Sequence, residues 1–178
     1  FEQGLELGRS FVQPKYWGKR SLEYLWYGIG AFLTKHPQYR YLFGPVTISG
    51  QLPMQAKELL VHFYQTQFAP REQLATSHSP FIISNSRRLE LNTIYDRTDS
   101  SKTPTYSDNF KILKRLLAEL GVAVPTLFKQ YSELCEPDGV KFLDFGIDAE
   151  FSDCLDGVVL VVLHKLLPKK RAKYLKMT

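Results

Sequence analysis

The sequence has few cysteines and no long apolar run, and both shortages restrict the class of protein. A membrane-spanning helix needs about 18 or more apolar residues in succession, and the chain contains no such run and no pattern of a secretory signal. Cys135 and Cys154 lack the spacing of a metal site, and one pair in a chain of this length is weak evidence for a disulfide. We therefore expect a cytoplasmic protein with two packed thiols.

Acidic residues are absent from segment 165–178, which we name the basic tail. Its positive charges are at Lys165, Lys169, Lys170, Arg171, Lys173 and Lys176. The formal net charge of +5 is a property of this tail, because the rest of the chain is close to neutral. We therefore expect no nucleic acid as partner, whereas an anionic membrane surface or an acidic carrier protein would suit the tail.

The composition is that of a globular protein, with 44% hydrophobic and 13% aromatic residues. A chain of 178 residues with this content suits one domain with a core, which we place at residues 1–164. Segment 70–105 is polar and long for a connection inside a compact domain. It is either a variable surface insertion or a lid that sets which substrate enters.

Residues 5–12 are predicted to form a strand that carries two charged side chains. Burying the charges of Glu6 and Arg9 in a strand would cost free energy, unless the two side chains are paired or have a role in the function of the protein. Side chains alternate along a strand, so a bulge near Gly8 would be needed to bring both to one side. A salt bridge without chemistry and a catalytic pair both explain this pattern.

The basic loop, residues 14–20, stands directly before a helix predicted at Leu22–His36. Unpaired N–H groups at a helix start and neighbouring cations together form an anion site. The residues assigned to this phosphate site are Lys15, Gly18, Lys19, Arg20 and Ser21, with Ser21 as the helix cap.

A second strand is predicted at Tyr39–Ser49, interrupted by Gly44 and Pro45. Proline cannot donate to a strand ladder, so the interruption indicates either a gap between strands or an edge bulge.

The rest of the chain alternates between helix and strand patterns, which is typical of an α/β fold. Helices are predicted at Leu52–Phe68, Ser107–Gly121 and Pro125–Cys135, and strands at Val140–Gly146 and Val158–His164. Ser107 is expected to cap its helix. His62 is expected on a helix surface rather than as a ligand.

The acidic segment, residues 144–156, contains five carboxylates at Asp144, Asp148, Glu150, Asp153 and Asp156. It lacks the spacing of a calcium loop, so we expect no dedicated metal site. Turns and helix caps explain most acids in such a loop, and binding of a substrate ammonium group is the alternative.

Several motifs together resemble known acyltransferases. The E-x-x-R of Glu6 to Arg9, followed by F-V-x-P, resembles the catalytic strand of N-acyl-homoserine lactone synthases. The P-x-Y motif, the Leu25-Trp26 pair, Y-L-F-G and the later G-I-D-A-E-F with D-G-V-V resemble the hemolysin-like ornithine-lipid N-acyltransferases. Both groups belong to the GCN5-related N-acyltransferase superfamily. The resemblance spans most of the chain except about residues 70–105 and the tail.

The resemblance implies a mixed sheet with flanking helices, with further strands of the fold before the segment that begins here. It also implies transfer of a fatty acyl group to the amine of an amino acid such as ornithine. The donor would be the phosphopantetheine thioester of an acyl carrier protein, or acyl-coenzyme A, as a co-substrate rather than a permanent cofactor. Arg20 stands where the superfamily has a small residue, which favours the single phosphate of a carrier over a full nucleotide.

The resemblance also implies roles for individual residues. Glu6 would be the base, and Arg9 would anchor either Glu6 or the substrate carboxylate. Gly44 would lie where the strands part around the pantetheine, and Asp148 and Asp153 would contact the substrate. The basic tail would give a peripheral contact at the inner membrane face. Two other functions remain open: a non-catalytic carrier- or membrane-docking module, and an acetyl-coenzyme A-dependent small-molecule acetyltransferase.

Overall fold

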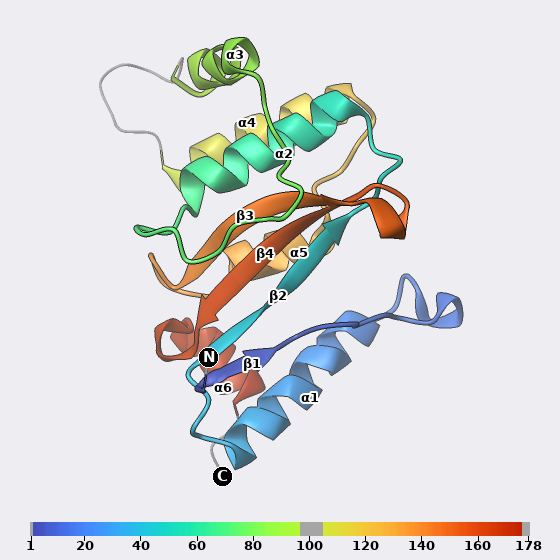
Figure 1. Cartoon of the computed structure of the whole chain (residues 1–178). Coiled ribbons are helices and arrows are strands. Elements are labelled where there is room, and N and C mark those ends of the chain that lie inside the picture. Colours follow the sequence, from blue (N-terminus) through green and yellow to red (C-terminus); the bar gives the residue numbers. More distant parts are fainter. Residues whose placement is uncertain (1, 97–104, 176–178) are drawn as a thin grey trace. The chain divides into compact units, whose positions relative to one another are not determined.

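A computed structural model describes residues 2–96 and 105–175 of the chain. Its strands are β1 (Gly4–Glu6), β2 (Tyr41–Ile48), β3 (Val140–Asp148) and β4 (Cys154–Val162), which form one sheet in the order β1-β2-β4-β3. β1 and β2 are parallel, and the arrows of β2 and β4 point in opposite directions in Figure 1. The predicted class, α/β with a mixed sheet and flanking helices, is therefore confirmed.

The four predicted helices are present, and two further helices, at Asn85–Asp96 and Pro168–Tyr174, were not predicted. Within the described ranges the α-helices are α1 (Ser21–Lys35), α2 (Met54–Gln67), α3 (Asn85–Asp96), α4 (Tyr106–Glu119), α5 (Thr126–Ser132) and α6 (Pro168–Tyr174). Short 3-10 turns are η1 (Pro14–Tyr16), η2 (Ala149–Phe151) and η3 (Leu163–Lys165). No helix of the described part is both long and apolar enough to cross a membrane.

The chain divides into two compact units, and β2, β3 and β4 each run from one unit into the other. Unit 1 comprises Phe1–Pro45, Gln130–Val140 and Val159–Thr178, and unit 2 comprises Val46–Lys129 and Lys141–Val158. Each unit has its own buried side chains. Both cysteines are free thiols, and Cys154 is buried.

In unit 1, α1 packs against α6 and against the end of α5. The indole N–H of Trp26 donates to Gln130 Oε1 at 3.0 Å, and the Trp26 ring meets Tyr131 edge-on with centroids 5.4 Å apart. Gly30 lets α6 approach closely, because a Cβ there would lie 1.9 Å from the backbone oxygen of Tyr174. Part of the basic tail is therefore a helix packed on α1, while Lys176 lies outside the described residues.

The predicted apolar face of α1 is only partly covered. Trp26 and Leu33 are buried, whereas Leu25 and Phe32 remain 39% and 40% exposed. A shallow groove of about 520 Å³ runs beside these exposed side chains and also touches Leu5 of β1. The apolar face of α1 that the sequence pattern predicts is therefore wider than the part of it that is buried in unit 1.

In unit 2, aromatic side chains form the core. The Tyr64 ring lies 4.7 Å from that of Phe142 and 5.0 Å from that of Phe128, measured between centroids, and Phe142 stacks on Phe145 at 5.7 Å. Helices α2 and α4 add the contact of Phe63 with Phe110.

The cap of α4 is Thr105, so the prediction of Ser107 is wrong. Thr105 Oγ1 accepts from the backbone N–H of Asp108, and the Asp108 carboxylate accepts from the backbone N–H of Thr105, each at 3.3 Å. This reciprocal arrangement satisfies two N–H groups at once, which Ser107 inside the first turn could not do.

His62 is not on a helix surface, contrary to the prediction. Its side chain is only 2% exposed in α2, and its ring stacks on Tyr95 of α3 with centroids 5.7 Å apart. The burial of His62 could not be predicted from the sequence, because the helix that covers it, α3, lies in segment 70–105, which was expected to be a polar insertion or a lid. Burial first, and then the charges of Arg88 and Arg87, hold the pKa of His62 below its ordinary value.

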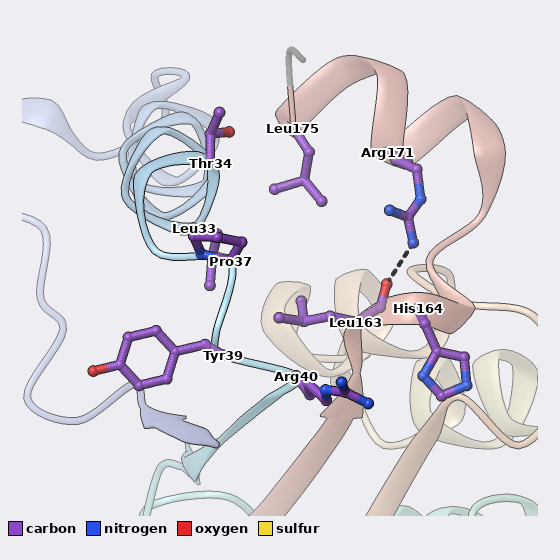
Figure 2. A pocket seen from close by; sticks show the side chains of 9 residues that line it. All are labelled: Leu33, Thr34, Pro37, Tyr39, Arg40, Leu163, His164, Arg171 and Leu175. Carbon is purple, nitrogen blue, oxygen red and sulfur yellow. Dashed lines mark hydrogen bonds between the residues drawn. The ribbon is translucent and has the colours of Figure 1, made fainter. Parts of the chain in front are cut away.

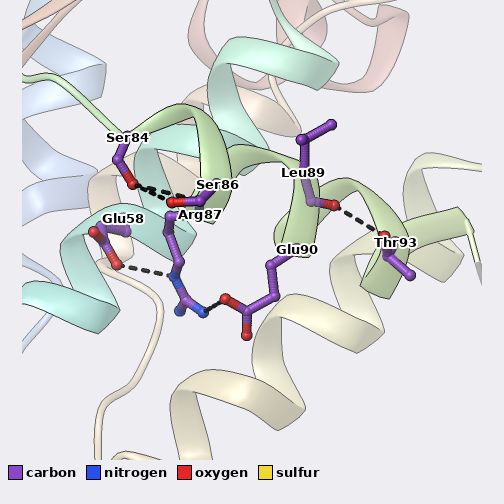
Figure 3. Close-up of polar contacts among 7 residues, drawn as sticks. All are labelled: Glu58, Ser84, Ser86, Arg87, Leu89, Glu90 and Thr93. Carbon is purple, nitrogen blue, oxygen red and sulfur yellow. Dashed lines mark hydrogen bonds and ion pairs between the residues drawn. The ribbon is translucent and has the colours of Figure 1, made fainter.

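Segment 70–105 is attached to unit 2 at two places. Before α3, the Phe81 N–H donates to the Phe145 carbonyl at 2.9 Å and the Ile147 N–H to the Ser79 carbonyl at 2.8 Å, which extends the pairing of β3. Within α3, Arg87 forms ion pairs with Glu58 of α2 at 3.0 Å and with Glu90 at 2.8 Å, as Figure 3 shows. Residues 97–104 of the predicted insertion lie outside the described residues.

Candidate functional site

The predicted catalytic strand is much shorter than expected. β1 ends at Glu6, after pairing Gly4, Leu5 and Glu6 with Tyr41, Leu42 and Phe43 of β2, and the Leu7 N–H adds one bond to the Phe43 carbonyl at 2.7 Å. The prediction of a strand through Val12 is therefore wrong. A strand through Val12 would have to include Arg9, whose φ of 54° lies in the left-handed region and is incompatible with strand geometry.

Glu6 lies at the exposed end of this parallel pair. Its carboxylate folds back over Gly8, where a Cβ would lie 3.0 Å from Oε1. Arg9 is also exposed, and among the described residues no ion pair joins it to Glu6. The structure thus brings a solvated carboxylate to the end of the parallel pair, but it does not bring Glu6 and Arg9 into contact.

Gly44 lies directly beside this end of the pair. A Cβ at Gly44 would lie 2.6 Å from the Leu7 carbonyl oxygen, so a larger residue would force the two chains apart. Gly44 therefore allows a close approach of backbone to backbone at the point where β1 stops. The backbones are in close contact at Gly44, so the predicted gap between the strands does not open at this residue. β1 itself stops at Glu6.

The basic loop is built around Tyr16. The ammonium groups of Lys15 and Lys19 lie 4.9 and 5.8 Å from the centroid of the Tyr16 ring. Gly18 has a φ of 70° and open space around it, which suits the tight turn between the two lysines. Lys15 and Lys19 are exposed, so the loop brings two accessible cations to one aromatic ring.

Ser21 and Arg20 are placed differently from the prediction. Arg20 is the residue before the helix, and Ser21 is the first helical residue, so the prediction of Ser21 as cap is wrong by one position. Its hydroxyl donates to the Tyr16 carbonyl at 2.9 Å and so closes the loop. The Arg20 guanidinium donates to Glu23 at 2.5 Å instead of pointing to the lysines.

Glu23 is a residue of this site that the sequence reasoning missed. Its carboxylate pairs with Arg20 and also with Lys173 of α6. The hydrogen bond from Arg20, followed by the one from Lys173, lowers the pKa of Glu23 to about 2. The spacing of Arg20 and Glu23 at a helix start was a signal for the first pair, whereas no local pattern points to Lys173.

The acidic segment lies in unit 2, and most of its carboxylates have structural partners. Asp144 accepts the Ser77 N–H at 2.6 Å, and Asp156 accepts the Thr47 hydroxyl at 2.6 Å. Asp148 caps η2 through two backbone N–H groups at 3.0 Å. Asp153 is exposed in a left-handed turn with a φ of 51°, and its carboxylate accepts no hydrogen bond within the described ranges.

The arrangement in unit 1 can hold an anion and accept a proton. Two exposed lysines stand in a loop before α1, and an exposed carboxylate stands at the end of β1. A phosphate would find charge complementarity at the loop. A protonated amine could lose its proton to the carboxylate.

Two curated relatives match nearly the whole chain. A glycine N(alpha)-acyltransferase of Bacteroides thetaiotaomicron is 29% identical over 180 residues, covering 97% of the chain and 51% of that protein. A glycine N(alpha)-acyltransferase of Phocaeicola vulgatus is 26% identical over 179 residues, covering 96% of the chain and 52% of that protein. The chain thus spans about half the length of these relatives. No protein-family model matches it, and no solved structure matches it.

Proposed function

We propose that this chain carries an acyl-transfer region of an N-acyltransferase, which joins a fatty acyl group to the amine of an amino acid. The observation that carries the proposal is the match of 97% and 96% of the chain to two proteins named glycine N(alpha)-acyltransferase. The E-x-x-R and Y-L-F-G motifs, which resemble acyltransferases of the GCN5-related superfamily, support the same reaction independently of those names.

The reaction that we propose is direct aminolysis of a thioester. The amine nitrogen attacks the thioester carbonyl carbon, the new C–N bond forms, the C–S bond breaks, and the thiol leaves. Glu6 accepts the proton that the amine must lose. Its exposed position at the end of β1 supports this role, since a substrate amine can reach the carboxylate from solvent. Arg9 is the candidate for binding the carboxylate of the amino acid.

The donor that we propose is an acyl carrier protein, with acyl-coenzyme A as the alternative. Lys15 and Lys19 offer two ammonium groups around Tyr16, while Arg20 is engaged by Glu23. Two point charges suit the single phosphate of phosphopantetheine, and the N–H groups at the start of α1 add to them. Gly44 is the candidate for bordering the thioester arm, which would pass beyond the end of β1 rather than between the backbones of Gly44 and Leu7, where they are in close contact.

The acceptor that we propose is an α-amino acid, either glycine, as in the names of the relatives, or ornithine, as in the hemolysin-like branch that the motifs resemble. Asp153 is the candidate for contacting an acceptor ammonium group, because its carboxylate has no hydrogen bond within the described ranges. Asp148 keeps one oxygen for the same purpose, since only Oδ1 accepts the cap hydrogen bonds. Lys169 and Lys170 of the basic tail are the candidates for a peripheral membrane contact in the cytoplasm.

The test uses the complete purified protein with each donor and each acceptor. Mass spectrometry should detect N-acylglycine or N-acylornithine, and the two donors are compared at equal concentration. Glu6→Gln keeps the size of the side chain but removes the proton acceptor, so the rate should fall by roughly a hundredfold. Glu2→Gln, a change of the same kind in the exposed residue four positions earlier, should leave the rate unchanged.

Absence of an N-acyl product with all four combinations would overturn the proposed function. If Glu6→Gln retained the wild-type rate per folded molecule, the function would stand and Glu6 would not be its base.

A further inference from the structure

A cavity in unit 1 lies away from the basic loop, at the opposite end of α1. It has a volume of about 670 Å³ and lies between the end of α1, the residues before β2, and the segment from η3 to α6. Small-molecule sites commonly have volumes of about 300 to 1,000 Å³. Neither the proposed acyl transfer nor the motifs of the sequence assign anything to this cavity.

The cavity has an apolar side and a polar side. In Figure 2, Leu33, Thr34 and Pro37 from the end of α1 lie on one side, and Arg171, His164 and Arg40 lie on the other. Leu163 and Leu175 stand between the two sides. A ligand that fits both sides must combine a hydrocarbon part with a polar head.

The polar side is suited to a negative charge. Arg40 and His164 are exposed, and neither side chain has a hydrogen bond or ion pair among the described residues. None of the nine described lining residues is acidic. The segment from Val159 to Leu175, which supplies one wall, also contains no acid. Among the described lining residues, therefore, the arginines face no carboxylate.

Arg171 gives the polar side a fixed geometry. Its guanidinium donates to the Leu163 carbonyl at 2.9 Å, and this bond holds the guanidinium beside the cavity. The other N–H groups of the guanidinium remain available to a ligand. The Leu163 N–H in turn donates to the Arg40 carbonyl at 2.9 Å. The backbone of Arg40 and the side chain of Arg171 are thus both anchored to Leu163, which places the two arginines beside the same cavity.

We propose that this cavity binds a single-chain amphiphile with an anionic head, either a carboxylate or a phosphate. The head would contact Arg40, His164 and Arg171, and the hydrocarbon chain would lie against Leu33, Pro37 and Leu175. Arginine is the residue best suited to the fork-like recognition of either head. The proposal does not depend on the acyl-transfer proposal, since it uses none of the residues of the basic loop or β1.

Calorimetry on the complete protein can test the proposal with four C10 probes below their micellar concentrations. The probes are decanoate, decyl phosphate, decan-1-ol and decyltrimethylammonium. At least one of the two anions should bind, and the uncharged and cationic probes should bind at least tenfold more weakly. The anion that binds more tightly identifies the head group.

Three variants locate the site. Arg40→Gln should weaken anion binding about tenfold, because it removes a charge-assisted hydrogen bond. Lys35→Gln is the matched control, since Lys35 is an exposed cation of α1 next to Thr34 but does not line the cavity, and its effect should stay within twofold. Thr34→Trp should fill the cavity and abolish binding. The melting temperature of each variant shows whether the fold is kept.

Three results would overturn the proposal: equal binding of decan-1-ol and the anions, equal losses in Arg40→Gln and Lys35→Gln, or unchanged binding in a folded Thr34→Trp variant. Loss of acyl transfer in Glu6→Gln with intact decanoate binding would keep the two proposals distinct.

Discussion

The basic loop and the acidic segment both concentrate charge at a turn, but they use it differently. In the acidic segment, Asp144, Asp148 and Asp156 each accept a hydrogen bond that holds a backbone or a hydroxyl in place. In the basic loop, Lys15 and Lys19 share an aromatic ring and remain exposed. Charges of the first kind stabilise the fold, and charges of the second kind are available to a ligand.

The largest expected effect on stability is at Asp144. Asp144→Ala leaves the half-buried Ser77 N–H without its acceptor and should lower the free energy of unfolding by about 1–3 kcal/mol. Urea denaturation measures this change. Asp153→Asn is the control in the same segment, because asparagine tolerates the left-handed φ of this position, and it should stay within about 0.5 kcal/mol. Equal losses in the two variants would break the comparison.

Asp148 should have an intermediate effect. Asp148→Ala removes the acceptor of two N–H groups at the start of η2, which should cost about 1 kcal/mol, as for other N-caps. Asp148→Asn keeps an acceptor oxygen and should recover most of that loss. If the asparagine variant were as unstable as the alanine variant, the charge rather than the hydrogen bond would be responsible.

The two lysines of the loop should have little effect on stability. Lys15→Gln with Lys19→Gln should change the free energy of unfolding by less than about 0.5 kcal/mol and weaken binding of phosphopantetheine, measured by calorimetry. Lys111→Gln with Lys114→Gln removes the same charge from α4 and should leave that binding unchanged. A large loss of stability in the loop variant would contradict this prediction and show that the two lysines stabilise the fold.

The smallest effect is expected at Glu23, and it depends on pH. The pKa of Glu23 is lowered from its ordinary 4.5 to about 2, so its pairing with Arg20 and Lys173 stabilises the fold above about pH 4.5 and is lost as the pH falls toward 2. Because the pair is solvated, the change should be modest. Thermal melts of wild type and Glu23→Gln should differ at pH 6 and converge near pH 2. Curves that stay parallel would contradict this assignment.

Helices were easier to predict than boundaries, for a physical reason. The helical spacing of apolar residues continues over several turns in α1, α2 and α4, so single residues that break the pattern do not obscure it. These three helices therefore lie within a few residues of their predicted positions. The length of β1 was overestimated because the alternation of apolar residues continues past Glu6, whereas the left-handed φ of Arg9 prevents any strand from running through to Val12.

The cap of α4 was misplaced because Thr105 and Ser107 both offer hydroxyls, and only the three-residue spacing of Thr105 to Asp108 makes the reciprocal cap.

The candidate site was only partly accessible to sequence reasoning. Lys15, Gly18 and Lys19 are neighbours in the chain, so their proximity follows from the loop itself. Partners that come from distant segments could not be found in this way. Lys173 reaches Glu23 only because α6 packs on α1, and His62 is buried only because α3 covers it.

The contact between Gly30 and the end of α6 limits how the tail can act toward any anionic partner. A flexible polybasic peptide would offer each of its cations to such a partner, and its binding would fall steeply with added salt. In the packed helix, Lys173 is neutralised by Glu23, while Arg171 keeps its charge but is held in place by a backbone oxygen. The tail therefore has a lower effective valence than its composition indicates, and its associations would respond to ionic strength more like those of a few lysines than those of a polycation.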